Sequence, residues 1–110
     1  MLSKEYRLPS HTKLLKPFFF KSSLFTVKYV ANNLPSSRFA FIVTKKKEKR
    51  AVYRNRIRRV FRSCVEEARL RIVEGYDMLF FLESGIIDKQ REELLQELEN
   101  FLESRDLLRT

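Results

Sequence analysis

The chain has little of the material from which catalytic and metal sites are usually built. Its 110 residues include one cysteine, one histidine and no tryptophan. A lone cysteine excludes an internal disulfide, and Cys64 with His11 offers no set of metal ligands of the zinc-site kind. Cys64 falls on the apolar side of a predicted helix, where a small core residue is expected. The sequence therefore predicts no catalytic residue set and no metal site of its own.

Turn formers and long apolar runs are also scarce. With two glycines and three prolines, the chain has few turn signals, so its secondary-structure elements should be long. No segment has the pattern of a signal peptide, and none has the length and apolarity of a membrane span. These features predict a single domain over residues 1–110, located in the cytoplasm and without a membrane partner.

Positive charge is what the chain has in excess. Lysine and arginine number 23 against 14 acidic residues, which gives a formal net charge of +9. The charge is clustered, because ten basic residues and a single acid, Glu48, lie between Lys45 and Arg62. Clustering on this scale predicts a polyanionic partner, and RNA fits best. An anionic membrane surface is the weaker alternative, since the other side of this segment has the pattern of ordinary protein core.

The pattern of apolar residues predicts an α/β fold, an α+β sandwich with the order α-β-β-α-β-α. A small sheet is packed by a long basic helix and a C-terminal helix. Turn residues between the first two strands predict a hairpin, Gly75 is the expected C-cap of the long helix, and Asp88 the expected N-cap of the last. The expected elements are a short helix at 10–16, strands at 24–30 and 38–44, a helix at about 51–74, a strand at 78–82 and a helix at about 89–104.

The long basic helix should have two different sides. Steps of three and four place Ile57, Phe61 and Cys64 on a buried stripe. The polar residues of the same segment fall away from that stripe or at its edge. The planar guanidinium of arginine can grip phosphate with two hydrogen bonds, and Asn55 can donate and accept at once, as a 2′-hydroxyl or a base edge requires. The helix start also favours phosphate, because its free N–H groups point outward.

Two parts of this region resemble one protein family. Arg38 to Lys46 is an Arg-led strand that ends in Thr-Lys-Lys, and Ala51 to Arg62 reads Ala-Val-Tyr-Arg-Asn-Arg-Ile-Arg-Arg-Val-Phe-Arg. At this spacing, in a basic chain of this length, the sequence closely resembles the bacterial ribonuclease P protein component. Looser similarity extends to Arg7-Leu8, the strand at 24–30, Gly75-Tyr76-Asp77 and the last helix.

The resemblance implies an RNA-dependent activity. Ribonuclease P is an endoribonuclease that removes the 5′ leader from precursor tRNA. Its catalytic component in bacteria is an RNA, and the small protein is the accessory subunit. The implied partners are this RNA, with one protein per RNA, and precursor tRNA. The implied cofactor is Mg²⁺, held mainly by the RNA. The resemblance also implies a left-handed β-α-β crossover, against the usual right-handed rule.

The resemblance further implies two sets of site residues. The set expected to bind the catalytic RNA is Lys45, Lys46, Arg50, Arg54, Asn55, Arg56, Arg58, Arg59 and Arg62. The set expected to line a cleft for the single-stranded leader, between the first helix and an open sheet face, is Leu14, Phe18, Lys28 and Lys46. Leu14 departs from the phenylalanine usual in the family. Glu83 stands after the third predicted strand, where many members have a basic residue.

Two other function classes remain open from the sequence. A non-enzymatic RNA-binding module, such as a small ribosomal protein, would have similar size and charge. A DNA-binding helix is weaker, because no helix-turn-helix and no dimer seam is visible. The arginines could also form a solvated face, some of them paired with Glu66 or Glu67. Reconstitution with a catalytic RNA would separate the first class from a ribonuclease P subunit.

Overall fold

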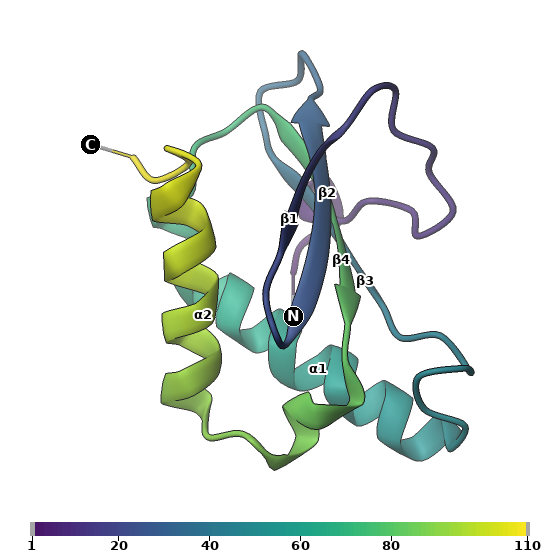
Figure 1. Ribbon diagram of the computed structural model, residues 1–110. Helices are drawn as coiled ribbons and strands as arrows, with labels where there is room; N and C mark the ends of the chain where they lie inside the picture. The colour runs from purple at the N-terminus through teal and green to yellow at the C-terminus, as the bar shows by residue number, and fades with distance from the viewer. Residues whose placement is uncertain (1, 110) are drawn as a thin grey trace.

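The computed structural model describes residues 2–109 and contains a four-stranded sheet and two α-helices. The strand order in the sheet is β1-β2-β4-β3, with β3 and β4 parallel and the other pairs antiparallel. Figure 1 labels the strands and the two α-helices. The elements along the chain are η1 (Lys4–Tyr6), β1 (Phe18–Lys21), β2 (Phe25–Ala31), β3 (Arg38–Ile42), α1 (Ala51–Ala68), η2 (Arg69–Arg71), β4 (Tyr76–Leu82), η3 (Ser84–Asp88) and α2 (Arg91–Ser104).

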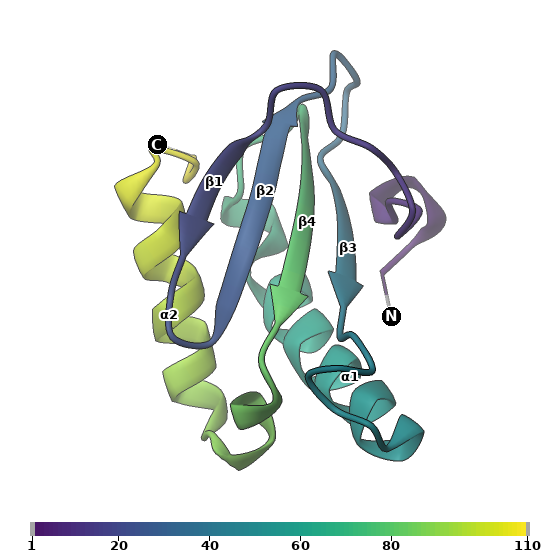
Figure 2. The ribbon, with the colours of Figure 1, turned by 45° about the vertical axis from the view of Figure 1, so that its right-hand side comes forward.

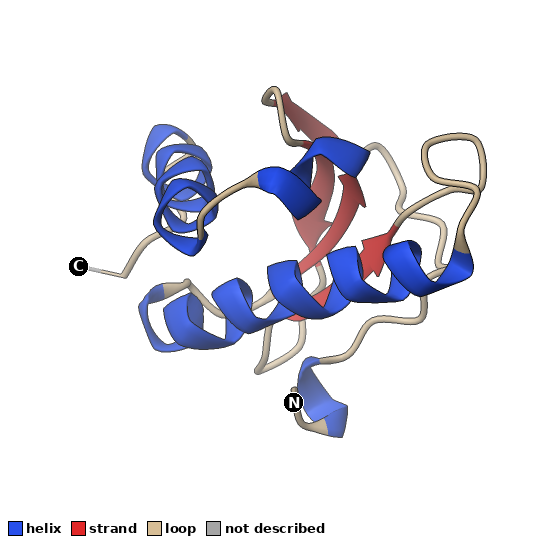
Figure 3. Cartoon of the chain, turned by 90° about the horizontal axis from the view of Figure 1, so that it is seen from below, coloured by secondary structure: helices blue, strands red, loops and turns tan. Residues whose placement is uncertain are grey.

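Both α-helices cover the same face of the sheet. Figure 2 shows the strands in front with α1 and α2 behind them, and Figure 3 shows α1 running across the width of the molecule. The core lies in this interface, where Phe25 and Phe80 of the sheet contact Phe61 of α1 and Phe101 of α2 with ring centroids 5.2–6.2 Å apart. Within residues 2–109 the other face carries no α-helix, and Leu8 and Leu14 pack against part of it.

The connection from β3 through α1 to β4 has an unusual hand. In Figure 2 both strands run down the page, β3 lies to the right of β4, and α1 passes behind the sheet. The chain therefore moves from right to left while α1 passes behind two downward strands, which makes the crossover left-handed. Parallel strands are nearly always joined by right-handed crossovers. The α/β fold with this crossover therefore agrees with the expectation from the family resemblance.

The predicted hairpin of the first two predicted strands is wrong. β2 and β3 are not neighbours, because β4 lies between them and pairs with both. β4 has apolar residues on both of its faces, with Met78 and Phe80 towards the helices and Leu79 towards the other side, so it is stable in the centre of the sheet. The residues between β2 and β3 do turn, but they lead the chain over the end of β4.

The predicted first helix at 10–16 is absent from the described residues. The only helical turn in this region is η1, and the Phe run forms the edge strand β1, which pairs with β2. Pro17 explains part of the failure, since the residue before proline is pushed out of the α-helical region. Lys16 has φ 48° and lies outside that region.

The helix ends also differ from prediction. α1 ends at Ala68 and is followed by the tight turn η2, so Gly75 does not cap it. Gly75 has φ 91° and serves the turn into β4, a conformation that glycine adopts without strain. Gln90, not Asp88, is the N-cap of α2, where it forms a capping box with Glu93.

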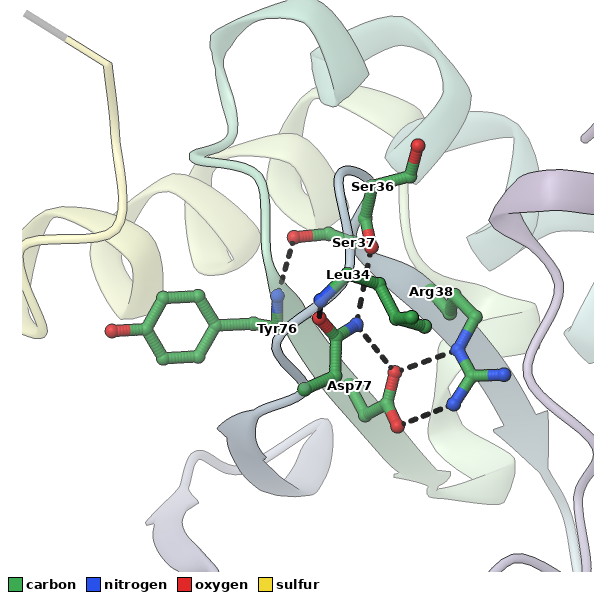
Figure 4. A network of polar contacts seen from close by, with 7 residues as sticks. Leu34, Ser36, Ser37, Arg38, Tyr76 and Asp77 are labelled. Carbon is green, nitrogen blue, oxygen red and sulfur yellow. Dashed lines mark hydrogen bonds and ion pairs between the residues drawn. The ribbon is translucent and has the colours of Figure 1, made fainter.

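A polar network closes the end of the sheet where β3 and β4 begin (Figure 4). The buried Asp77 carboxylate accepts hydrogen bonds from Arg38 Nε at 2.9 Å and Nη2 at 2.8 Å, and from Asn32 Nδ2 at 2.8 Å. Ser37 Oγ donates to the carbonyl of Val73 and accepts from the N–H of Tyr76. The network fixes the crossover on either side of α1, because it joins residues before β3 to residues that open β4.

The C-terminus of α2 reaches the edge strand β1. Arg105 Nη2 donates to the carbonyl of Phe19 at 3.1 Å, and the guanidinium lies 5.5 Å from the ring centroid of Phe20. Phe20 in turn contacts Phe101, with centroids 5.0 Å apart. β1 is therefore attached to the molecule both by its pairing with β2 and by the end of α2.

Candidate nucleic-acid interface

The basic helix α1 is anchored to the core by one stripe of residues. Ile57, Phe61, Cys64, Val65 and Ala68 are fully buried, as the apolar spacing predicts. Burial raises the pKa of the Cys64 thiol, which keeps it protonated and in the role of a core residue. The arginines of the helix are thereby held on a rigid element, which fixes the positions of their charges.

The basic loop at 43–50 is held in shape by its single acid. Glu48 accepts hydrogen bonds from Arg50 Nε at 3.0 Å, from Arg50 Nη2 at 3.2 Å and from the Arg50 backbone N–H at 3.0 Å. These bonds stabilise the carboxylate and lower the pKa of Glu48 to about 2. Arg54 Nη1 donates to the carbonyls of Glu48 and Lys49 at 2.9 and 2.8 Å. Arg50 and Arg54 thus order the loop in addition to carrying charge.

Three further residues of the predicted RNA-binding set, on α1, make side-chain contacts within the protein. Arg58 Nη2 donates to the side-chain carbonyl of Asn55. The Arg62 guanidinium lies 5.8 Å from the ring centroid of Phe41 on β3. Partial burial, together with the charges of Arg54 and Arg62, lowers the pKa of Arg58 from its ordinary value. Desolvation is the main cause of the lowered pKa, and the neighbouring cations Arg54 and Arg62 add to it, so a bound anion would stabilise the charged form of Arg58.

The remaining predicted residues face solvent. Lys45, Lys46, Arg56 and Arg59 are exposed, and none of them forms an ion pair with another residue within 2–109. Of the alternative partners considered from the sequence, Glu67 pairs with Arg91 of α2 at 3.0 Å and not with an arginine of α1. These cations have no ion pair within the described residues to break when they bind phosphate, so this surface suits an RNA backbone.

A pocket of about 530 Å³ lies on the open face of the sheet. Its walls come from residues 10–14 and Pro17 on one side and from the sheet on the other. Leu14 and Lys28 of the predicted cleft line it, together with Phe19 and Phe81. The Lys28 Nζ lies 5.5 Å from the ring centroid of Phe19 and 5.2 Å from that of Phe81. A cation and two aromatic rings therefore meet at one point of the pocket.

Phe18 and Lys46, which were also predicted to line the leader cleft, do not line this pocket. Phe18 pairs with Tyr29 in the sheet, and their rings lie 5.5 Å apart on the helix-covered face. Phe19 pairs with Lys28 and faces the pocket. The sequence left open which phenylalanine of the run 18–20 lines the cleft, and it did not point to Phe81. Once the Phe run is known to be a strand, alternation alone assigns Phe18 and Phe19 to opposite faces.

The acidic residue after β4 is neutralised within the chain. Glu83 Oε1 accepts a hydrogen bond from Lys47 Nζ at 2.8 Å, which joins the basic loop to the end of β4. Glu83 thereby restrains the loop through its ion pair with Lys47. Many members of the family that the sequence resembles have a basic residue here, so this chain lacks a positive charge at that position.

Metal-ligand clusters and membrane-spanning helices are both absent from the described residues. Within 2–109, no three histidine, cysteine or acidic side chains come together as a ligand group. None of the helices in the same range is long and apolar enough to cross a bilayer.

Comparison with known proteins identifies the family of the chain. The family model described as Ribonuclease P matches residues 5–105. The chain belongs to the ribonuclease P protein family. A ribonuclease P protein component from Synechococcus elongatus is 37% identical over 73 residues, which cover 66% of this chain and 60% of that protein. One from Histophilus somni (strain 2336) is 34% identical over 105 residues, which cover 88% of this chain and 84% of that protein.

Solved structures of ribonuclease P proteins have the same fold. The protein from Thermotoga maritima matches with a TM-score of 0.72 at 21% identity, over 79% of this chain and 82% of that chain. The protein from Staphylococcus aureus matches with a TM-score of 0.70 at 22% identity, over 100% of this chain and 97% of that chain. The chain spans 60% of the length of the Synechococcus relative that it matches. Family and fold, as the sequence resemblance implies, are thus confirmed.

Proposed function

We propose that this protein is the protein subunit of ribonuclease P, the endoribonuclease that removes the 5′ leader from precursor tRNA. Family membership supports the assignment, and one structural observation carries it. A rigid basic helix packs on one face of the sheet, and the opposite face holds an aromatic pocket in which a lysine lies near two rings. The basic helix suits a structured RNA and the pocket suits an unpaired strand, so one protein can contact both at once.

The helix α1 and its preceding loop bind the catalytic RNA. Arg56, Arg58, Arg59 and Arg62 present guanidinium groups that can each hold a phosphate in two hydrogen bonds. Lys45 and Lys46 add charge at the end of β3. Because Glu48 fixes Arg50 and Arg54 in the loop, the cations are preorganised and little conformational entropy is lost on binding. The binding should weaken steeply with salt, since each neutralised phosphate releases counterions.

The pocket on the open sheet face holds the leader. Phe19 and Phe81 offer ring faces to unpaired bases, and stacking of this kind is tolerant of sequence, as a variable leader requires. Lys28 lies between the two rings and can move its ammonium onto a leader phosphate. Leu14 supplies apolar contact from the opposite wall. Precursor tRNA would thus be bound more tightly than mature tRNA, which lacks the leader.

Catalysis belongs to the RNA in this proposal. The resemblance to the family supports Mg²⁺ as the cofactor, and the ion would be held mainly by RNA phosphates. The protein neutralises charge, positions the leader and thereby lowers the Mg²⁺ concentration that the RNA needs. The expected complex contains one protein and one RNA molecule. The place of action would be the cytoplasm, where precursor tRNA is processed.

Reconstitution tests the proposal. The purified protein and a bacterial ribonuclease P RNA are mixed with a 5′-extended tRNA at low Mg²⁺, where the RNA alone is slow. Cleavage at the leader junction should accelerate, and the protein alone should not cleave. RNA binding without any acceleration would support the alternative of a non-enzymatic RNA-binding module. Cleavage by the protein alone would place catalysis in the protein and overturn the assignment.

A further inference from the structure

The leader pocket, the pocket proposed to hold the leader, is lined by Leu14, Phe19, Lys28 and Phe81. A second, separate pocket lies where the N-terminal segment crosses the edge of the sheet. Its volume is about 240 Å³. Leu2, Leu8 and Phe41 contribute apolar surface, and Arg7, Ser10 and Arg62 contribute polar groups. Only Ser10 also lines the leader pocket. This pocket therefore lies between α1 and the leader pocket, and the proposed function assigns it no role.

The two arginines of this pocket are available to an anion. Neither Arg7 nor Arg62 forms an ion pair with a carboxylate in the described part of the chain. They come from distant parts of the sequence, since Arg7 follows η1 and Arg62 lies on α1. Two unpaired guanidinium groups next to apolar and aromatic surface suit a ligand that is both negatively charged and planar.

The backbone of β3 adds hydrogen-bonding groups to the wall of the pocket. The N–H of Leu8 donates to the carbonyl of Phe39 at 2.8 Å on the outer edge of β3. Backbone groups alternate along a strand, so the N–H and C=O of Phe41 point to the same edge. No described residue pairs with β3 there beyond the bridge of Arg7 with Phe39. A donor and an acceptor thus stand side by side, the arrangement that the edge of a nucleobase matches.

We propose that this pocket takes one unpaired nucleotide of the RNA that α1 binds. The base packs against Phe41 and Leu8 with its edge on the β3 backbone, and the phosphate lies between Arg7 and Arg62. The volume is below the roughly 300–1,000 Å³ of pockets that hold drug-sized ligands, which suits a single nucleotide. The identification of that RNA as the catalytic RNA rests on the proposed function, because Arg62 belongs to the same helix face.

Mononucleotides test the pocket without any RNA partner. The ¹⁵N-labelled full-length protein is titrated with AMP, GMP, CMP and UMP, and with inorganic phosphate as a comparison. At least one nucleotide should shift the amide signals of Leu8, Ser10 and Phe41 in a saturable manner, and Arg7→Ala should abolish these shifts. Equal shifts with phosphate alone would show that no base is recognised, and shifts confined to other regions would show that the pocket is unused. Either result overturns the proposal.

Binding of the catalytic RNA provides the second readout, with Lys4→Ala as the matched control. Lys4 carries the same charge, is exposed and does not line the pocket. Arg7→Ala should weaken binding roughly tenfold, whereas Lys4→Ala should weaken it by about twofold, the effect of one general charge. Melting curves check that both variants are folded. Equal losses would overturn the proposal. If the wild-type protein activates the RNA but mononucleotides do not bind, this inference fails and the proposed function stands.

Discussion

Phe18 and Phe19 are neighbours in the sequence that point to opposite faces of the sheet, which makes them a matched pair for testing the leader pocket. Phe19 is 55% exposed and lines the pocket, whereas Phe18 is 60% exposed and lies on the helix-covered face. Phe19→Ala should therefore weaken binding of precursor tRNA in the reconstituted complex, and Phe18→Ala should not. Mature tRNA should bind equally to the wild type and to both variants.

The expected change in the Kd for precursor tRNA follows from the loss of base stacking. The loss of folding stability should be about the same for Phe19→Ala and Phe18→Ala. A base stacked on an aromatic ring is worth about 1–3 kcal/mol, so Phe19→Ala should raise the Kd for precursor tRNA roughly 5- to 150-fold. Each ring is somewhat less than half buried. With about 200 Å² for a buried phenylalanine and about 25 cal/mol per Å², either truncation costs about 2 kcal/mol of stability. The two melting temperatures should fall by similar amounts.

The assay is a competition between precursor and mature tRNA for the complex of protein and RNA, at fixed salt because the affinity depends on it. The ratio of the two dissociation constants isolates the leader from the rest of the tRNA. An unchanged ratio for Phe19→Ala, or an equal loss for Phe18→Ala, would refute the placement of the leader on the open face of the sheet.

Three further predictions concern the basic surface and its supports. Arg56→Ala and Arg59→Ala should each reduce the slope of log K against log salt by about 1 while leaving the melting temperature unchanged, because both side chains are exposed and unpaired; an unchanged slope would remove them from the RNA contact. Glu48→Gln should flatten the pH dependence of stability between about pH 4.5 and 2. The Glu48 carboxylate, whose folded pKa is lowered to about 2, stabilises the fold above its unfolded pKa and loses that contribution as the pH falls. Urea unfolding at several pH values measures this, and the same pH dependence in the wild type and the variant would contradict it. Asp77→Ala should lower the free energy of unfolding by about 2–3 kcal/mol, because Arg38 and Asn32 lose their shared acceptor. Arg109→Ala is the control: it removes an exposed pair with Glu74 and one hydrogen bond to the carbonyl of Ile72, and its cost should stay below about 1 kcal/mol.

The helix α1 could be predicted from the sequence because its signals are local. Apolar steps of three and four identified Ile57, Phe61 and Cys64 as buried, and the structure confirms them. The strands β2 and β3 were also placed correctly to within a few residues. Their pairing could not be predicted, because a turn at 32–37 is consistent with either a hairpin or a passage over the end of another strand. Only the burial of β4 on both faces, a property of the whole sheet, decides between them.

The cleft was the least predictable part for a related reason. Its residues were assigned by matching positions to a helix that this chain does not form. A one-residue change in the pairing of β1 would exchange Phe18 and Phe19 between the two faces, so a correct cleft requires a correct register. Register is set by the pairing of Phe19 with Lys28 and by the packing of Phe20 on Phe101, neither of which leaves a local signal in the sequence.

The contact of Arg105 with β1 has a consequence for the protein before it meets any RNA. An edge strand made of three phenylalanines is the kind of segment that recruits a strand from another molecule. A recruited strand would need the carbonyl of Phe19, and Arg105 already occupies it with a charged group. Resistance to self-association during synthesis and storage would then depend in part on the side chain of Arg105, which is not among the residues proposed to bind RNA.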